Sequence, residues 1–448
     1  MTASIQARAS RALSVAFLVA VNVACSSVGP DYVRPSVNVP SAYKEAASGQ
    51  KPPQPRDGSA HERWWEIYGD TQLDALVEQV NAANPSIHAA EARVRQARSL
   101  ANADKAAQFP TLFAGGTNDL GLLANWELDL WGRIRRSVEA SGAAAQASAA
   151  DLAAAKLSMQ AQLVQSYFLL RVQDAEIRLL QDTVAAYERS LQLTRNQYAA
   201  GVAARADVVP AQAQLGAAQA QMLDARVVRS QLEHAIAVLI GKAPADFSLE
   251  VAPINITVPA VPTALPADLL VRRPDIAAAE RRMAAASAQI GVAEAASYPA
   301  VSLFGGVSIR HSVGGEKTTM PLFDAGAIRA LSAKAGAAYD EAFADYRQVI
   351  LNGFREVEDN LAALQLLNEA AQAQAEAVKA ARESMTITNN QYRAGIVSYL
   401  SLVVVQAGAL NNERAALGIL RRRLIANVTL IKALGGGWQG DTSSERAP

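Results

Sequence analysis

Hydrophobic residues recur at every seventh position in two long stretches of the chain, residues 133–200 and 327–394, and neither stretch contains proline. The repeating positions are Leu163, Leu170, Ile177, Val184, Leu191 and Tyr198 in the first stretch and Val357, Leu364, Ala371, Val378, Met385 and Tyr392 in the second. A sustained seven-residue repeat makes a helix supercoil against a neighbour. We therefore predict two coiled-coil helices, each of which would extend roughly 100 Å.

A returning helix is expected after each long helix, because Gly201 and Gly395 stand where a helix C-terminus favours glycine. The seven-residue repeat resumes beyond these glycines, at Val208, Leu215 and Met222 and at Val403, Leu410, Leu417, Leu424 and Ile431. Shorter helices at 85–108 and 274–297 would lie along the rest of each long helix. We expect Asp207 and Ser401 to cap the returning helices, with Pro210 in a first turn.

The chain contains two copies of one unit. "LTRNQYAAGV" at 193–202 nearly recurs as "ITNNQYRAGI" at 387–396, an offset of 194 residues, and upstream an offset of 189 aligns Phe109-Pro110 with Tyr298-Pro299. The predicted divisions are a signal peptide at 1–24, an extended lipidated segment at 25–61, a first repeat at 62–241, a Pro-rich linker at 242–266, a second repeat at 267–434 and a tail at 435–448.

A different pattern, strict alternation, appears at 110–130 and 299–323. In "LLANWELDL" and "VSLFGGVSI" one set of alternate positions is apolar and the other is mostly polar, which is typical of strands with one apolar face. We expect two strands in each region, with "SVGGEK" (Ser312 to Lys317) as a turn and "EKTTMPLF" as a poor fourth strand. The hairpins could pack on a soluble protein or enter a membrane. Four strands cannot close a barrel, so a membrane barrel would need several copies of the chain.

The N-terminus indicates export. Arg8 and Arg11 precede an apolar run of ten residues, too short to span a bilayer as a helix and typical of a signal peptide. The only cysteine, Cys25, follows a small residue at the end of this signal, which indicates covalent lipid attachment. The alternative is an ordinary signal peptide with a chance cysteine.

Composition and motifs argue against catalysis and nucleic-acid binding. The 448 residues carry 42 basic and 42 acidic side chains, so no basic surplus favours nucleic acid. The four histidines, at positions 61, 88, 234 and 311, lack metal-binding spacing, and no phosphate loop, zinc-protease motif or nucleophile elbow is present. We expect no enzymatic activity, no metal and no cofactor apart from the lipid.

Nearly the whole chain resembles the TolC superfamily of outer-membrane efflux proteins, specifically the OprM/NodT-type lipoproteins. "CSSVGPDYVRP" is similar to the family's lipidated start, and "ANWELDLWGRIRR" to its second strand and the turn into the long helix. The strongest stretch is "LLVRRPDIAAAERRMAAASAQIGVAEAASYPAVSLFG", and "QYRAGIVSYL" resembles the family's periplasmic tip.

The resemblance implies a mainly α fold with a small β part. Long antiparallel helical hairpins would form a periplasmic α-barrel, and each chain would contribute four strands to a trimeric transmembrane β-barrel. The implied function is passive conduction of drugs or other toxic small compounds out of a Gram-negative cell, with antibiotic resistance as a consequence. The implied partners are two further copies of the chain, a periplasmic adaptor (membrane fusion) protein, an RND-type inner-membrane pump and outer-membrane lipid. The implied modification is an acyl chain such as palmitate on Cys25.

Several tip residues are candidates for turning, docking or gating: Gly201, Asp207, Gly395, Tyr399, Leu400 and Val404. The family has acidic residues where this chain has Val397 and Val404, so an apolar constriction at Leu400 is the better hypothesis than a tip closed by charge pairs. Asp207 could cap a helix or line the gate, and the two glycines could serve the turn or contact a partner.

At the other end of the helices, Pro110 and Pro299 are expected at the helix–strand transitions. Trp126 and Trp131 could belong to a membrane-interface girdle or to a packed joint. A region of 21 residues barely holds two spanning strands, which need about 9–11 residues each. Two alternatives therefore stay open: a protein-secretion or metal-efflux duct of the same fold, and a lipid-anchored periplasmic coiled-coil scaffold whose strands do not insert.

Overall fold

The computed structural model describes residues 27–45, 63–115, 121–254, 256–261, 266–308 and 312–438. The signal peptide, Cys25 and the last ten residues of the tail lie outside these described residues. The chain divides into two compact units. The first draws on Met1–Val39, Ala89–Ala154 and Pro274–Asn352, and the second on Pro40–His88, Ala155–Arg273 and Gly353–Pro448.

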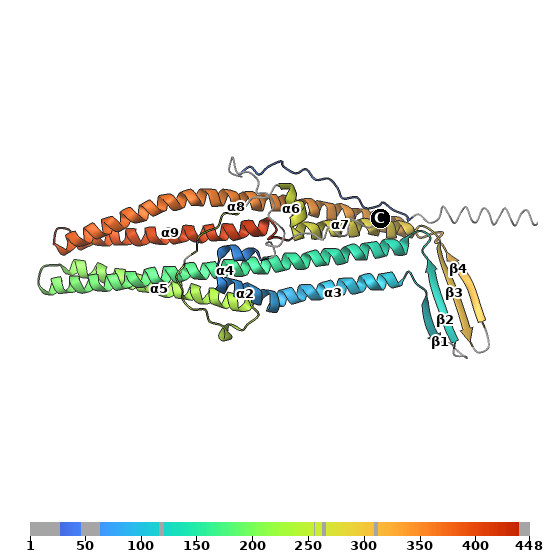
Figure 1. Cartoon of the computed structure of the whole chain (residues 1–448), viewed down its shortest axis with the longest axis horizontal. Coiled ribbons are helices and arrows are strands. Elements are labelled where there is room, and N and C mark those ends of the chain that lie inside the picture. The colour runs from blue at the N-terminus through green and yellow to red at the C-terminus, as the bar shows by residue number, and fades with distance from the viewer. Residues whose placement is uncertain are drawn as a thin grey trace, which may run out of the picture. The chain divides into compact units, whose positions relative to one another are not determined.

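Two long helices of 67 residues each, α4 (Arg133–Ala199) and α8 (Ala327–Arg393), confirm the prediction from the seven-residue repeat to within one residue (Figure 1). Each is followed by a 35-residue returning helix, α5 (Arg205–Leu239) or α9 (Tyr399–Ala433). The repeating positions of α4 from Leu163 to Leu191 are all buried. Within the described residues, no helix combines the length and the apolar character needed to cross a membrane.

The shorter helices are α2 (Thr71–Ala83), α3 (Pro85–Ala106), α6 (Pro266–Arg272) and α7 (Pro274–Ala295), with two short 3-10 helices, η1 (Trp64–Tyr68) and η2 (Pro244–Asp246). Asn84, between α2 and α3, donates its side-chain amide to the Leu239 carbonyl at 2.7 Å. Arg273, between α6 and α7, donates in the same way to the Ala433 carbonyl at 3.2 Å. These pairs lie at corresponding positions of the two repeats, so both returning helices end on the same kind of joint.

A glycine is required at each of these joints. Gly241 and Gly435 have φ angles of 73° and 96°, in the left-handed region that favours glycine. A Cβ atom at Gly241 would lie 2.3 Å from the Ala83 carbonyl oxygen, and one at Gly435 would lie 2.1 Å from the Arg272 carbonyl oxygen. The duplication therefore preserves a backbone-to-backbone contact that any side chain would obstruct.

A buried charge cluster holds the linker between the repeats against α4 and α5. Arg171 donates to Asp174 at 3.0 Å and to the Glu250 carbonyl at 2.8 Å. Arg229 donates to the same carboxylate at 2.7 Å and to the Leu249 carbonyl at 2.6 Å. Arg171 and Asp174 are almost fully buried, so each charge depends on its partner. We call these three charged residues the linker clamp.

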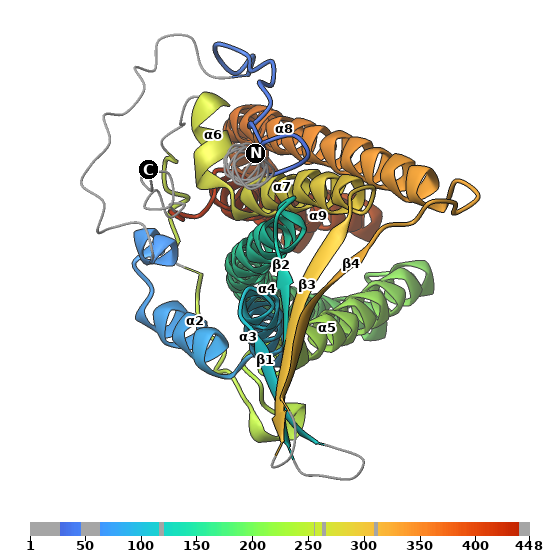
Figure 2. The ribbon, with the colours of Figure 1, turned by 90° about the vertical axis from the view of Figure 1, so that its right-hand side faces the viewer.

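Four strands form one antiparallel sheet in the order β1-β2-β3-β4 (Figure 2). They are β1 (Thr111–Gly115), β2 (Gly121–Leu128), β3 (Ala300–Ser308) and β4 (Ser312–Thr319). The central β2–β3 pair runs from Gly121 opposite Ser308 to Leu128 opposite Val301, so the two repeats meet in the middle of the sheet.

The expected turn before the fourth strand was wrong, and the strand begins earlier than "EKTTMPLF". Ser312–Lys317 is not a turn but the greater part of β4, and the strand extends to Thr319. Gly314 and Gly315 pair with Gly305 and Phe304, and the Phe304 ring covers Gly315, where an added Cβ would lie 3.0 Å from it. An aromatic ring over a strand glycine supplies the packing that the glycine lacks, so paired glycines here belong to a strand.

The sheet has two faces of different chemistry. The register puts Leu112, Leu122, Ala124, Trp126, Leu303 and Val307 on one face. The opposite face carries Asn125, Glu127, Ser302 and Lys317 together with Phe113, Leu123, Phe304 and Val313. The predicted apolar face is therefore present over β1, β2 and β3, but β4 adds Glu316 to it, opposite Leu303. The other face is polar only toward the helix-proximal ends of the strands.

Candidate functional site: the hairpin ends and the strand–helix junction

The two helical hairpins end in matching turns, at the left of Figure 1. Gly201 and Gly395 have φ angles of 72° and 71°. The next N–H groups bond back into the helix, from Val202 to the Gln197 carbonyl at 2.8 Å and from Ile396 to the Gln391 carbonyl at 2.9 Å. A Cβ at either glycine would meet no neighbour, so glycine is needed for its backbone conformation rather than for space.

The expected caps were wrong by three residues. The backbone is already extended at Ala204 and Ser398, so these are the N-cap residues, and Asp207 and Ser401 are the third residues of their helices. The Asp207 carboxylate accepts the Ala204 N–H at 3.2 Å, so it still satisfies a free donor at the helix start. Pro210 consequently lies in the second turn of α5, where it removes a helical hydrogen bond.

A tyrosine of the second hairpin is buried in the first. The Tyr392 hydroxyl lies 2.8 Å from the Thr194 hydroxyl and donates to Gln197 Oε1 at 2.9 Å. We call Thr194 and Gln197 the first socket. Around it lies a buried apolar cluster of Leu191, Val208, Ala211, Tyr392, Tyr399 and Leu402, drawn from both hairpins. Sequence reasoning missed this contact, although the repeated Gln-Tyr pair marked the position.

Tyr399 makes a second contact between the hairpins. Its hydroxyl donates to Gln214 Oε1 at 3.2 Å, and the Gln214 amide donates to Gln406 Oε1 at 3.4 Å. Its ring meets that of Tyr392 edge-on, with centroids 5.6 Å apart. Burial raises the pKa of both hydroxyls, so they stay neutral at physiological pH.

The candidate gate residues separate into two groups. Tyr399 is buried between the hairpins, whereas Leu400 and Val404 are 66% and 63% exposed. Leu400 and Val404 are four residues apart on α9 and so share one helix face. The chain thus presents an apolar stripe at this end of α9.

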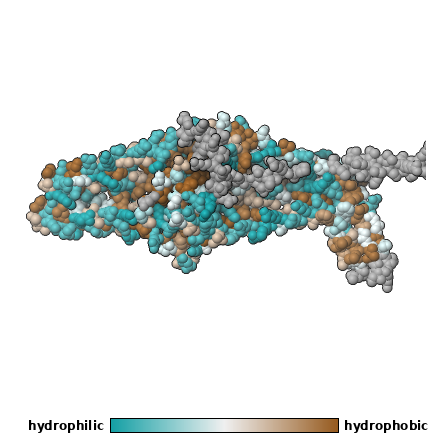
Figure 3. Space-filling model, viewed as in Figure 1, coloured by the Kyte–Doolittle hydropathy of each residue, from teal (hydrophilic) through white to brown (hydrophobic). Residues whose placement is uncertain are grey.

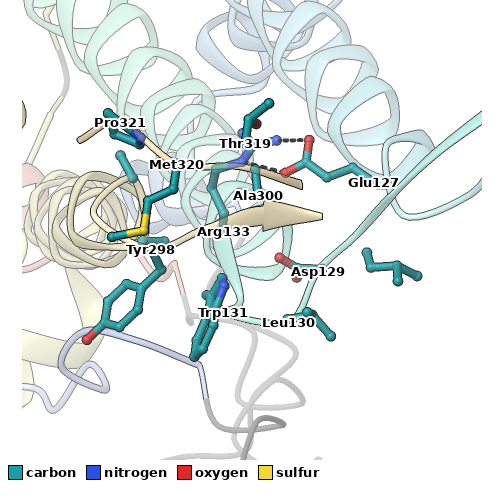
Figure 4. A pocket seen from close by; sticks show the side chains of 13 residues that line it. Glu127, Asp129, Leu130, Trp131, Arg133, Tyr298, Ala300, Thr319, Met320 and Pro321 are labelled. Carbon is teal, nitrogen blue, oxygen red and sulfur yellow. Dashed lines mark hydrogen bonds and ion pairs between the residues drawn. The ribbon is translucent and has the colours of Figure 1, made fainter. Parts of the chain in front are cut away.

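Pro110 and Pro299 lie at the helix–strand transitions, each directly before a strand. The Trp126 indole donates to the Gln108 carbonyl at 3.0 Å, and the Trp131 indole donates to the Pro299 carbonyl at 2.8 Å. Trp131 also stacks on Tyr298 with centroids 4.8 Å apart (Figure 4). Both indoles therefore hydrogen-bond at the strand–helix junction, while Trp126 stays 37% exposed.

Beside this aromatic pair lies a half-open pocket of about 300 Å³. Glu127 and Arg133 form a two-pronged ion pair on its wall, with distances of 2.8 and 3.0 Å (Figure 4). The Asp129 carboxylate accepts the first N–H groups of α4 from Ile134 and Arg135, both at 2.8 Å. These charges are paired locally, so the pocket lies at a joint between strand and helix.

Comparisons with known proteins match this architecture. A model of the family described as outer membrane efflux protein matches residues 76–242 and 265–436. The toluene efflux pump outer membrane protein TtgC of Pseudomonas putida is 29% identical over 467 residues, which cover 96% of each chain. The cation efflux system protein CusC of Escherichia coli is 26% identical over 455 residues, covering 94% of this chain and 98% of CusC. The solved structure of the outer-membrane channel OprN has a TM-score of 0.83 at 32% identity, covering 92% of this chain and 100% of that chain.

Paired helical hairpins and a four-stranded antiparallel sheet, together with these matches, define the class of outer-membrane efflux channels. The chain belongs to the outer membrane efflux protein family. It is accordingly a transport protein of the Gram-negative outer membrane that extends into the periplasm.

Proposed function

We propose that three copies of the chain form one channel, which passively conducts small toxic compounds from an inner-membrane pump to the cell exterior. The observation that carries this proposal is the exposed apolar face of the sheet. Leu112, Leu122 and Val307 on this face are each more than 60% exposed, and Figure 3 shows hydrophobic residues gathered over the strands. An apolar face of this kind needs a partner or a membrane to cover it.

The edges of the sheet support association with further copies of the chain. β1 and β4 are edge strands, and unpaired backbone groups at an edge are costly in lipid. Pooling the strands of three chains would pair every edge and close a barrel. The strands of the central pair have eight and nine residues, close to the length of about 9–11 residues that a tilted spanning strand needs.

The names of the relatives support a proposal for the partners and cargo. Relatives are named as outer membrane proteins of toluene efflux, pyoverdine export and cation efflux systems. For this chain we propose a periplasmic adaptor protein at the hairpin ends, an RND-type pump as the energy source, and drugs or solvents as cargo. A lipid on Cys25 would add an anchor in the outer membrane.

A matched pair of substitutions on one strand tests the proposal. Leu122 and Leu123 are neighbours on β2 but point to opposite faces of the sheet, and they are 62% and 48% exposed. On the lipid face an arginine costs about 2–4 kcal/mol at the membrane centre and about 0–1 kcal/mol near the interfaces, whereas the lumen face tolerates charge. Leu122 is the second residue of β2, so we expect Leu122→Arg to reduce the amount of trimer in outer-membrane fractions and Leu123→Arg to leave it nearly unchanged. Equal behaviour of the two variants, or a native mass of one copy for the unsubstituted chain in detergent, would contradict the proposal.

A further inference from the structure

The two hairpins carry the same tyrosine contact sites, but one chain uses only half of them. The repeat offset of 194 makes Tyr198 the counterpart of Tyr392 and makes Thr388 and Gln391 the counterparts of the first socket. We call Thr388 and Gln391 the second socket. The sequences "TRNQY" and "TNNQY" thus each contain a complete socket and a complete tyrosine.

Within the chain, Tyr392 occupies the first socket. Tyr198 is 49% exposed, although its counterpart is buried. Thr388 and Gln391 are only half-buried, whereas Thr194 in the first socket is fully buried. Among the residues that the structure describes, no hydrogen bond is recorded for the side chains of Tyr198, Thr388 or Gln391. One tyrosine and one socket are therefore left over, on different hairpins.

We infer that Tyr198 of one copy binds the second socket, Thr388 and Gln391, of a second copy. This inference rests on the proposed trimer and specifies its contacts at the hairpin ends. A surface that binds a different surface of an identical copy forms a head-to-tail interface, which closes into a ring when the rotation permits. In a ring of three chains, the six hairpins would then be joined by six tyrosine contacts, alternately within a chain and between chains.

The side chains around the second socket fit a tyrosine. Met385, the counterpart of buried Leu191, is half-buried on α8 one turn before Thr388. It offers an apolar wall to an aromatic ring, and thioether–aromatic contacts are favourable. The second socket thus has the same chemistry as the first, a hydroxyl and an amide beside an apolar side chain.

At the hairpin ends, the tyrosine contact between copies is weaker than the one within a chain. The counterpart of Tyr399 is Arg205, and the counterpart of its acceptor Gln214 is Gly408, so the second tyrosine bond has no equivalent between copies. Neighbouring copies are thus joined by one tyrosine contact, whereas the two hairpins of one chain are joined by two tyrosine contacts. Copies separated by detergent or heat should therefore keep their own two hairpins together.

Site-specific photocrosslinking in the full chain tests the inference. With benzoylphenylalanine in place of Tyr198, we expect irradiation of the purified protein to join two copies, with the crosslink in residues 385–391. The matched control carries benzoylphenylalanine in place of Tyr392, and its crosslink should fall in residues 194–197 of the same chain. If the Tyr198 probe disturbs assembly, Tyr198→Phe is the second test, and it should lower the temperature at which the trimer dissociates by a few degrees.

The outcomes separate this inference from the proposed function. A trimer whose Tyr198 probe marks another segment, or whose dissociation temperature is unchanged by Tyr198→Phe, would overturn the inference and leave the channel in place. A chain whose native mass is that of one copy would overturn both.

Discussion

Tyr392→Phe removes one hydroxyl from the contact between the two hairpins and leaves the aromatic ring. The hydroxyl lies 2.8 Å from the Thr194 hydroxyl and 2.9 Å from Gln197 Oε1. Thr194 is fully buried but keeps its own hydrogen bond to the Ser190 carbonyl at 3.0 Å. A net hydrogen bond contributes about 1 kcal/mol, and the Tyr392 hydroxyl takes part in two such contacts. We therefore expect the free energy that holds the two hairpins together to fall by about 1–2 kcal/mol, which raises the population of separated hairpins by a factor of roughly 5–30.

Hydrogen–deuterium exchange measures this population directly. In the detergent-solubilised protein, amides of residues 191–211 and 392–405 should exchange faster in Tyr392→Phe by about that factor, while the β-strands should be unaffected. Thr194→Val in the Tyr392→Phe background is the matched control. Removing both partners should cost less than the sum of the single substitutions, because the contact between the two hydroxyls is already lost in the first substitution. Unchanged exchange in Tyr392→Phe, or additive costs in the double variant, would refute the role given to this hydroxyl.

Three further predictions concern the joints and the pH dependence. Gly241→Ala should lower the free energy of unfolding by at least about 1–2 kcal/mol, because Gly241 has a positive φ and lies against a carbonyl group. Gly216→Ala, in the open middle of α5, should raise this free energy by about 0.5–1 kcal/mol. Thermal unfolding measures both. Asp174→Asn should cost about 3–5 kcal/mol by leaving the buried Arg171 without a carboxylate and Arg229 with Glu233 alone, and limited proteolysis should then cut near residue 250. The pKa values of Tyr392 and Tyr399 are raised by burial in the folded protein. Their burial therefore stabilises the fold below pH about 10, and this contribution is lost as the pH rises through the raised pKa values. The unfolding temperature should be constant from pH 6 to 9 and should fall above about pH 10.

The helices could be predicted from the sequence because three independent signals agree. The seven-residue repeat predicts a helix, the absence of proline permits a helix of this length, and a glycine marks its C-terminus. Gly201 and Gly395 occupy their turns with left-handed backbone, which is the physical reason that the pattern is informative.

The sequence was less informative where one residue type suits two positions. An acidic residue is favourable both as an N-cap and in the first helical turn, so Asp207 could not be placed to the residue. Paired glycines favour a turn, but Gly315 lies in a strand because Phe304 of the neighbouring strand covers it. The cover comes from residues more than ten positions away, and local pattern cannot reveal it.

The tyrosine contact at the hairpin ends was missed for a related reason. Tyr198 and Tyr392 occupy the same place in the repeat, yet one is exposed and the other is buried. The difference arises because Tyr392 lies on the side of its hairpin that contacts the other hairpin of the chain, whereas Tyr198 does not. A duplicated sequence predicts two equivalent sites, and tertiary structure decides which of them is filled.

Current through a planar lipid bilayer tests the central claim most directly. The unsubstituted protein should add stable conductance steps, and Leu122→Arg should abolish them while Leu123→Arg retains them. The account of this chain as a channel subunit would be contradicted if the correctly folded trimer never adds conductance. This result would have to hold both for the unsubstituted protein and for Tyr392→Phe.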